Sequence, residues 1–117
     1  DQMFREVKEV DVNAADKDGY TALIWASCNG SENVMETLLK HERINVNAAD
    51  KFGNTALIWA SRYSHNEVVQ ILLEVKEVDV NAPDTDGWTA LIWASHNGHK
   101  EVVQMLLNFE GISVNLA

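Results

Sequence analysis

The sequence predicts an all-α solenoid, built from helix-turn-helix units whose connecting loops project as hairpin tips. The segment Thr-Ala-Leu-Ile-Trp-Ala-Ser occurs three times, at residues 21–27, 55–61 and 89–95, so the chain repeats every 34 residues. Each junction between units reads Asn-Ala-x-Asp-x-x-Gly, a composition typical of turns. A unit of 34 residues cannot bury its apolar faces alone, so neighbouring units must stack.

The repeat makes residues 1–117 one domain with three full units and one partial unit. The full units are 16–49, 50–83 and 84–117, and residues 1–15 form the tail of a further unit. The sequence of residues 6–14 is identical to that of residues 74–82. Residues at the same position of different units are therefore expected to share one structural role.

A first helix is predicted directly after each turn. Thr21, Thr55 and Thr89 are placed to cap its N-terminus with their hydroxyl groups. In the first full unit this helix runs from Ala22 to about Cys28. The run Ala-Leu-Ile-Trp-Ala is apolar on nearly all sides, which favours an inner helix packed between neighbours.

A second, longer helix follows after a break. Gly30 and Gly98 suit a left-handed turn between the two helices, and Ser64 stands at this position in the middle unit. The second helix starts near Ser31, His65 and His99. Its apolar residues recur at i, i+1, i+4 and i+5, as in Val68, Val69, Leu72 and Leu73. This spacing predicts one buried face and one solvated face.

Charge and cysteine content restrict the partners and the compartment. The chain has 9 Lys plus Arg against 18 Asp plus Glu, a net charge of −9, which disfavours nucleic acid and anionic membranes as partners. No apolar run is long enough to span a membrane, and the first residues lack the pattern of a signal peptide. Cys28 is the single cysteine and cannot form an internal disulfide, which favours an intracellular location, cytoplasm or nucleus.

The last unit carries Asp-x-x-Gly-x-Thr-x-Leu-x-x-Ala, then Gly-His-x-Glu-Val-Val-x-x-Leu-Leu, then Val-Asn. The residues that carry this pattern are Asp84, Gly87, Thr89, Leu91, Ala94, Gly98, His99, Glu101, Val102, Val103, Leu106, Leu107, Val114 and Asn115. With it the chain resembles the ankyrin-repeat family over its whole length. The resemblance implies an L-shaped solenoid with hairpin tips at right angles to paired helices, and protein binding as the activity.

Three departures from the family pattern affect the expected packing. Alanine replaces the proline of the motif at Ala22, Ala56 and Ala90. Isoleucine replaces its histidine at Ile24, Ile58 and Ile92, so apolar packing must replace the hydrogen bonds of the imidazole. One extra residue falls between the Leu-Leu and Val-Asn segments, where the family template is the weakest guide.

No arrangement of residues predicts an enzyme, a cofactor or a metal site. His65 and His99 should lie one repeat apart, roughly 10 Å, too far to share a metal. The loops that begin at Asp16 and Asp84 open like calcium loops but lack the closing glutamate, so hairpin turns are expected. Cys28 has no His or Asp partner at a spacing that the family geometry would bring together.

Positions that differ between units mark the expected binding surface. Within one repeat protein, framework positions recur and surface positions drift. The drifting positions lie at the hairpin tips and at the ends of the first helices, which line the concave face that the family uses for binding. The predicted central anchors are Phe52, Arg62, Tyr63 and Trp88, with Tyr20, Asn54 and His96 beside them. Aromatic residues and arginine dominate interface energies.

Other residues leave alternatives open. Trp25, Trp59 and Trp93 recur at one position, and we expect core packing with ring edges at the groove rather than a ligand platform. Near-identical repeats also suit a structural spacer, or a designed or recently duplicated scaffold. In some family members the Asn of Val-Asn-Ala is hydroxylated, but a structural role in the hairpin explains Asn47 and Asn81 sufficiently.

The ends of the solenoid are expected to be uncapped. Met105, Leu106 and Leu107 are as apolar as their internal equivalents, and Met3 and Phe4 are left without a preceding helix pair. A stable solenoid normally has polar outer faces at its ends. Either further repeats flank this segment, or copies associate end to end.

Overall fold

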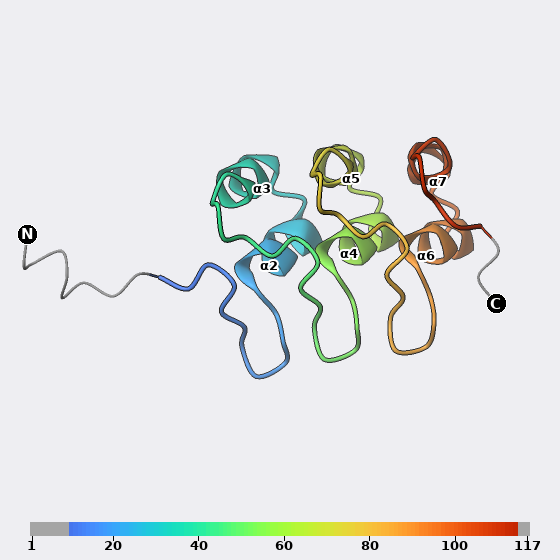
Figure 1. The fold of residues 1–117 in the computed structure, drawn as a ribbon. Coiled ribbons are helices and arrows are strands. Elements are labelled where there is room, and N and C mark those ends of the chain that lie inside the picture. The colour runs from blue at the N-terminus through green and yellow to red at the C-terminus, as the bar shows by residue number, and fades with distance from the viewer. Residues whose placement is uncertain (1–9, 115–117) are drawn as a thin grey trace, which may run out of the picture.

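A computed structural model describes residues 10–114, which form six helices in two layers (Figure 1). The inner layer contains α2 (Ala22–Asn29), α4 (Ala56–Arg62) and α6 (Ala90–His96). The outer layer contains α3 (Glu32–Leu39), α5 (Asn66–Leu73) and α7 (Lys100–Leu107). Long loops project from the inner layer, away from the outer helices (Figure 1). The predicted all-α solenoid of helix-turn-helix units is confirmed.

The inner helices begin where the threonine caps predict. The hydroxyl oxygens of Thr21, Thr55 and Thr89 accept hydrogen bonds from the backbone N–H of the residue three positions later, at 3.2, 3.2 and 3.3 Å. Each cap satisfies one of the N–H groups that a helix start leaves without an intrahelical partner. Alanine at the first helical position therefore suffices in place of proline.

A left-handed residue separates the inner helix from the outer helix in every unit. Gly30 has φ 65° and Gly98 has φ 73°, and Ser64 adopts the same conformation with φ 57°. Ser64 is the one residue other than glycine with positive φ in the described range. The predicted turn is confirmed, and in the middle unit a side chain occupies a conformation that favours glycine.

The hairpin loops are held by aspartate side chains rather than by strands. In the middle loop Asp50 Oδ1 accepts hydrogen bonds from the backbone N–H of Phe52 at 3.0 Å and of Asn54 at 2.9 Å. Between residues 10 and 114 the only β pairing is an isolated bridge between Ala49 and Thr55. The carboxylate takes up N–H groups that a strand ladder would otherwise pair, so each tip is a loop.

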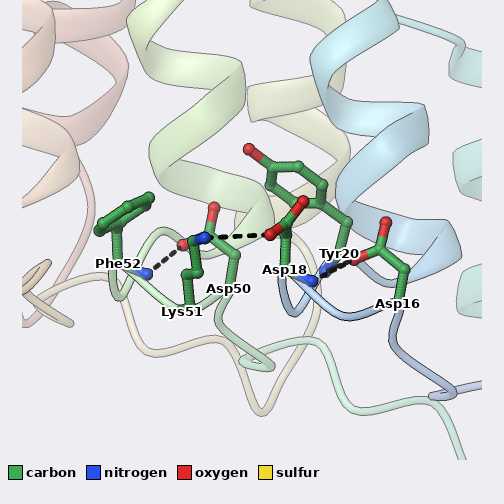
Figure 2. A network of polar contacts seen from close by, with 6 residues as sticks. All are labelled: Asp16, Asp18, Tyr20, Asp50, Lys51 and Phe52. Atoms are coloured by element: carbon green, nitrogen blue, oxygen red, sulfur yellow. Dashed lines mark hydrogen bonds and ion pairs between the residues drawn. The ribbon is translucent and has the colours of Figure 1, made fainter.

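Adjacent hairpin loops are joined by backbone hydrogen bonds, and we call each such junction between neighbouring units a seam. The N–H of Lys51 donates to the carbonyl of Asp18 at 3.0 Å, and the N–H of Thr85 donates to the carbonyl of Phe52 at 2.9 Å. Figure 2 shows the first of these seams, where the ammonium of Lys51 also pairs with the carboxylate of Asp18 at 3.0 Å. A Cβ added to Gly53 would lie 2.9 Å from the Asp84 Cα, so this close approach requires glycine.

The apolar core runs along the solenoid between the two layers. Its fully buried side chains include Ile24, Ile58, Met35, Val68, Val69, Leu72, Val102 and Leu106. Ile24 and Ile58 are each 1% exposed, so apolar packing does replace the family's imidazole at these sites. Each repeat contributes a similar layer to the core, and the layers are continuous across the seams.

The residues that follow each outer helix and lead to the next hairpin loop, such as 74–82 after α5, form what we call a return segment. An asparagine of the preceding unit bonds to each return segment. Asn47 Oδ1 accepts from the backbone N–H of Asp79 at 2.7 Å, and its Nδ2 donates to the carbonyl of Glu77 at 2.8 Å. Asn13 and Asn81 make the equivalent pair of bonds. The asparagine is thus structural, as expected, but it bridges to the next unit's return segment rather than bracing its own hairpin.

Residues of the last described unit are more exposed to solvent than their equivalents in the inner units. Leu106 is fully buried, whereas Leu107 is 50% exposed. A Cβ added to Gly87 or Gly98 would meet nothing within 4 Å, in contrast to Gly53. The other expected end, with Met3 and Phe4, lies outside the described residues. No helix within residues 10–114 is long and apolar enough to cross a membrane.

Candidate protein-binding surface

A cleft lies where the second and third hairpin loops meet the inner helices α4 and α6. Its volume is about 300 Å³, and it is lined by Tyr20, Phe52, Asn54, Trp59, Arg62, Asp84, Thr85, Asp86 and Trp93. Four of the seven residues chosen from the sequence therefore line one continuous surface, and they come from three separate stretches of chain. We call this site the concave cleft.

The other three chosen residues pack against the walls of the concave cleft. The Tyr63 ring stacks on Trp59 with centroids 5.6 Å apart and an interplanar angle of 21°. The Trp88 and His96 rings lie 4.6 and 6.4 Å from the ring of Trp93. Tyr63, Trp88 and His96 thus extend the aromatic walls of the cleft through their contacts with Trp59 and Trp93.

Exposure differs strongly among the chosen residues. Phe52 is 55% exposed and Tyr63 is 52% exposed, so both present large apolar area to a partner. Asn54 is only 4% exposed, and its Oδ1 is buried with no hydrogen-bond partner in the described structure. The expectation that Asn54 is a surface residue is therefore wrong: it is buried, and its backbone N–H and carbonyl both bond to Asp50 of the same hairpin.

Two of the three recurring tryptophans, Trp59 and Trp93, line the concave cleft. Trp25 is 50% exposed, and Trp59 and Trp93 are half-buried. The indole N–H of Trp59 donates to Asp50 Oδ2 at 3.0 Å, and that of Trp93 donates to Asp84 Oδ2 at 2.8 Å. Trp93 packs against the buried core cluster with part of its ring at the cleft, as expected, whereas Trp25 is exposed and does not line the cleft. The carboxylates of Asp50 and Asp84 that shape the hairpin loops also orient Trp59 and Trp93.

Arg62 connects the walls contributed by two repeats. Its guanidinium carbon lies 4.4 Å from the ring centroid of Trp59 and 4.0 Å from that of Trp93. Cation–π contacts of this kind contribute about 0.5–2 kcal/mol each, more when they are shielded from water. The equivalent position is Cys28 in the preceding unit and His96 in the following one, so this bridge is specific to the second seam.

The histidines at the starts of the outer helices brace the seams. His65 Nε2 lies 2.9 Å from the carbonyl oxygen of Cys28, and His99 Nε2 lies 2.7 Å from that of Arg62. Because a carbonyl only accepts, Nε2 must carry the proton in both rings. Among residues 10–114 no three His, Cys, Asp or Glu side chains form a group able to hold a metal ion.

Near the first seam, the pKa values of the Cys28 thiol and the Tyr20 hydroxyl are both raised. Burial raises the pKa of the Cys28 thiol, and the carboxylate of Asp50 raises it further, so the neutral thiol is favoured. Burial raises the pKa of the Tyr20 hydroxyl, with a further contribution from Asp50. Both shifts oppose the anionic form, which is the reactive form of a cysteine.

A larger groove lies on the outer layer, and sequence reasoning missed it. Its volume is about 690 Å³, and its walls come mainly from α5 and α7. The lining residues are Glu32, Asn66, Glu67, Gln70, Ile71, Glu74, Glu101, Gln104, Met105 and Asn108. The sequence signal was available as the solvated face of the second helices, but that face reads simply as polar surface.

The family pattern in the sequence agrees with comparison against known families. The family model described as ankyrin repeats (3 copies) matches residues 2–84 and 42–117. Comparison with curated proteins gives no significant match. Ankyrin repeats are generally protein–protein interaction modules and are typically not enzymes. The repeat pattern, the paired helices with projecting loops and the family match together show that the chain belongs to the ankyrin-repeat family.

Proposed function

We propose that this domain is a non-catalytic module that binds a protein partner through the concave cleft and the aromatic surface beside it. The observation that carries the proposal is the exposure of Phe52 and Tyr63 at positions that are not aromatic in the other units. About half of each ring remains exposed, and exposed aromatic area is typical of binding interfaces. The cleft volume of about 300 Å³ suits one or two partner side chains.

The alternative is a spacer that only holds other parts of a repeat array apart. Near-identical repeats favour this reading, because a spacer needs only scaffold positions. The aromatic surface favours binding, since a spacer would keep these positions polar. The two functions differ in what they require of Phe52 and Tyr63, and substitution of these residues separates them.

The test compares capture of cellular proteins by three forms of the domain. The wild type, the double variant Phe52→Ala/Tyr63→Ala and the control Val34→Ala are immobilised, and captured proteins are identified by mass spectrometry. Val34 is a suitable control because it is 50% exposed but lies on α3, in the outer layer. We expect proteins that the wild type and Val34→Ala retain and the double variant loses. Identical capture by all three forms would favour the spacer.

A further inference from the structure

In the described part of the chain, the guanidinium of Arg62 makes ring contacts but no ion pair. Its guanidinium contacts the indoles of Trp59 and Trp93 through ring contacts at 4.4 and 4.0 Å. Stacking uses the face of a guanidinium, whereas its N–H groups lie along the edge. Within residues 10–114 no carboxylate pairs with Arg62, although the nearby Lys51 pairs with Asp18 at 3.0 Å.

The walls that hold Arg62 are themselves fixed. The indole N–H groups of Trp59 and Trp93 donate to the carboxylates of Asp50 and Asp84 at 3.0 and 2.8 Å. The other carboxylate oxygen of each aspartate accepts the N–H groups that shape its hairpin loop. Arg62 is therefore held by a chain of contacts across two repeats. A side chain that is already ordered loses less entropy when it forms a further bond.

The concave cleft opens beside this arginine and adds an apolar wall. Arg62 and Phe52 line the same cleft, and Phe52 is 55% exposed. A planar guanidinium matches a carboxylate with two parallel N–H···O bonds. We propose that Arg62 binds the carboxylate of an Asp or Glu side chain in the partner, next to an apolar residue that packs on Phe52. This inference rests on the proposed function of the cleft.

Charge decides among the ligands that an arginine could take. The carboxylate of Asp84, which also lines the cleft, already accepts three hydrogen bonds within the protein, so a partner lysine or arginine could pair only with Asp86 and would lie in the same small cleft as the guanidinium of Arg62. A doubly charged phosphate would be repelled by Asp86, which lines the same cleft and is exposed. The net charge of −9 also repels strongly acidic proteins at long range. The partner segment should therefore carry one isolated acidic residue in an otherwise neutral or basic sequence.

The experiment uses a phage-displayed library of random unmodified peptides. The library is selected on the immobilised wild-type domain, with selection against Phe52→Ala/Tyr63→Ala to remove peptides that bind elsewhere. We expect the retained peptides to share one Asp or Glu beside an aromatic or aliphatic residue. Affinities of one synthetic peptide and of its Glu→Gln (or Asp→Asn) form are then measured by calorimetry against wild type, Arg62→Gln, Arg62→Lys and the control Lys100→Gln, which removes an exposed positive charge on the outer helix α7.

Loss of the guanidinium and loss of the peptide carboxylate should each weaken binding at least about tenfold, and their combination should cost little more. Arg62→Lys keeps the charge without the planar fork and should be intermediate, while Lys100→Gln should bind like wild type. Retained peptides that lack an Asp or Glu, or that bind Arg62→Gln as well as wild type, would overturn the carboxylate assignment alone. If the double variant retains every peptide that the wild type retains, both this inference and the proposed function fail. Thermal unfolding of Arg62→Lys verifies that the fold is intact.

Discussion

Ser64→Gly should stabilise the domain, because Ser64 is held at φ 57° where the equivalent residues are Gly30 and Gly98. The left-handed conformation costs a residue with a Cβ about 1–2 kcal/mol. Two terms oppose the gain. Glycine makes the unfolded chain more flexible, which costs about 0.4–1 kcal/mol. The hydrogen bond between Ser64 Oγ and Asn66 Oδ1, 3.1 Å long, is lost, at about 0.5 kcal/mol.

The net stabilisation is therefore about 0.5 kcal/mol, with an upper limit of about 1 kcal/mol. Ser64→Ala provides the comparison, because alanine loses the hydroxyl and keeps the backbone strain. We expect the glycine variant to exceed the alanine variant by about 1 kcal/mol, which corresponds to roughly 4 °C in melting temperature. Urea unfolding followed by circular dichroism measures both. A glycine midpoint at or below that of alanine would show that the turn stores no strain.

Four further predictions concern other parts of the molecule. Trp59→Ala should cost about 2–3 kcal/mol in urea unfolding, because it removes half-buried area and leaves Asp50 Oδ2 unbonded, whereas the exposed Trp25→Ala should cost less than about 1 kcal/mol. Asn47→Ala should lower the free energy of unfolding by about 2 kcal/mol, because two backbone groups of the next return segment lose their hydrogen-bond partner. An unchanged urea midpoint would show that these two bonds do not stabilise the contact between units. The pH dependence of Cys28 alkylation by iodoacetamide should give a thiol pKa above that of the unfolded chain, because burial keeps the thiol protonated. The free energy of unfolding should therefore fall as pH rises above the ordinary thiol pKa. Equal thiol pKa values in the folded and unfolded chain would contradict this. Light scattering should show a mass that rises above 13.1 kDa with concentration if copies associate through the uncovered last unit, and a constant monomer mass would exclude that association.

The scaffold was predictable from the sequence because its determinants are local. Thr21 needs only the N–H three residues later, and Ser64 needs only its own backbone conformation. The position of the tryptophans was not predictable in this way. Ala-Leu-Ile-Trp-Ala is apolar all round, so periodicity does not indicate which side faces the cleft. The bond from Trp59 to Asp50 spans a hairpin and a helix start, and no short-range pattern encodes it.

The candidate site was predictable in its members but not in their arrangement. Comparison of the units indicated Phe52, Tyr63 and Arg62, because the residue at each of these positions differs between units, and this comparison needs no knowledge of contacts. The same comparison indicated Asn54, which is buried. A difference between units shows only that the repeat does not require one residue type at that position, and it does not show that the position faces solvent. That Arg62 spans two indoles depends on the distance between neighbouring repeats, which only the stacked structure supplies.

The seams between units depend on atoms that every unit possesses. The hairpin of one unit donates a backbone N–H to a backbone carbonyl of the preceding unit, and glycine provides the clearance. A duplicated unit would therefore meet suitable neighbours on both sides without any compensating substitution. Lengthening the array by whole units is thus open to this gene through simple duplication, while an exposed side chain such as that of Phe52 can change in one copy without removing these backbone bonds. Addition of a repeat and substitution of the exposed side chains of one repeat are therefore independent changes in this architecture.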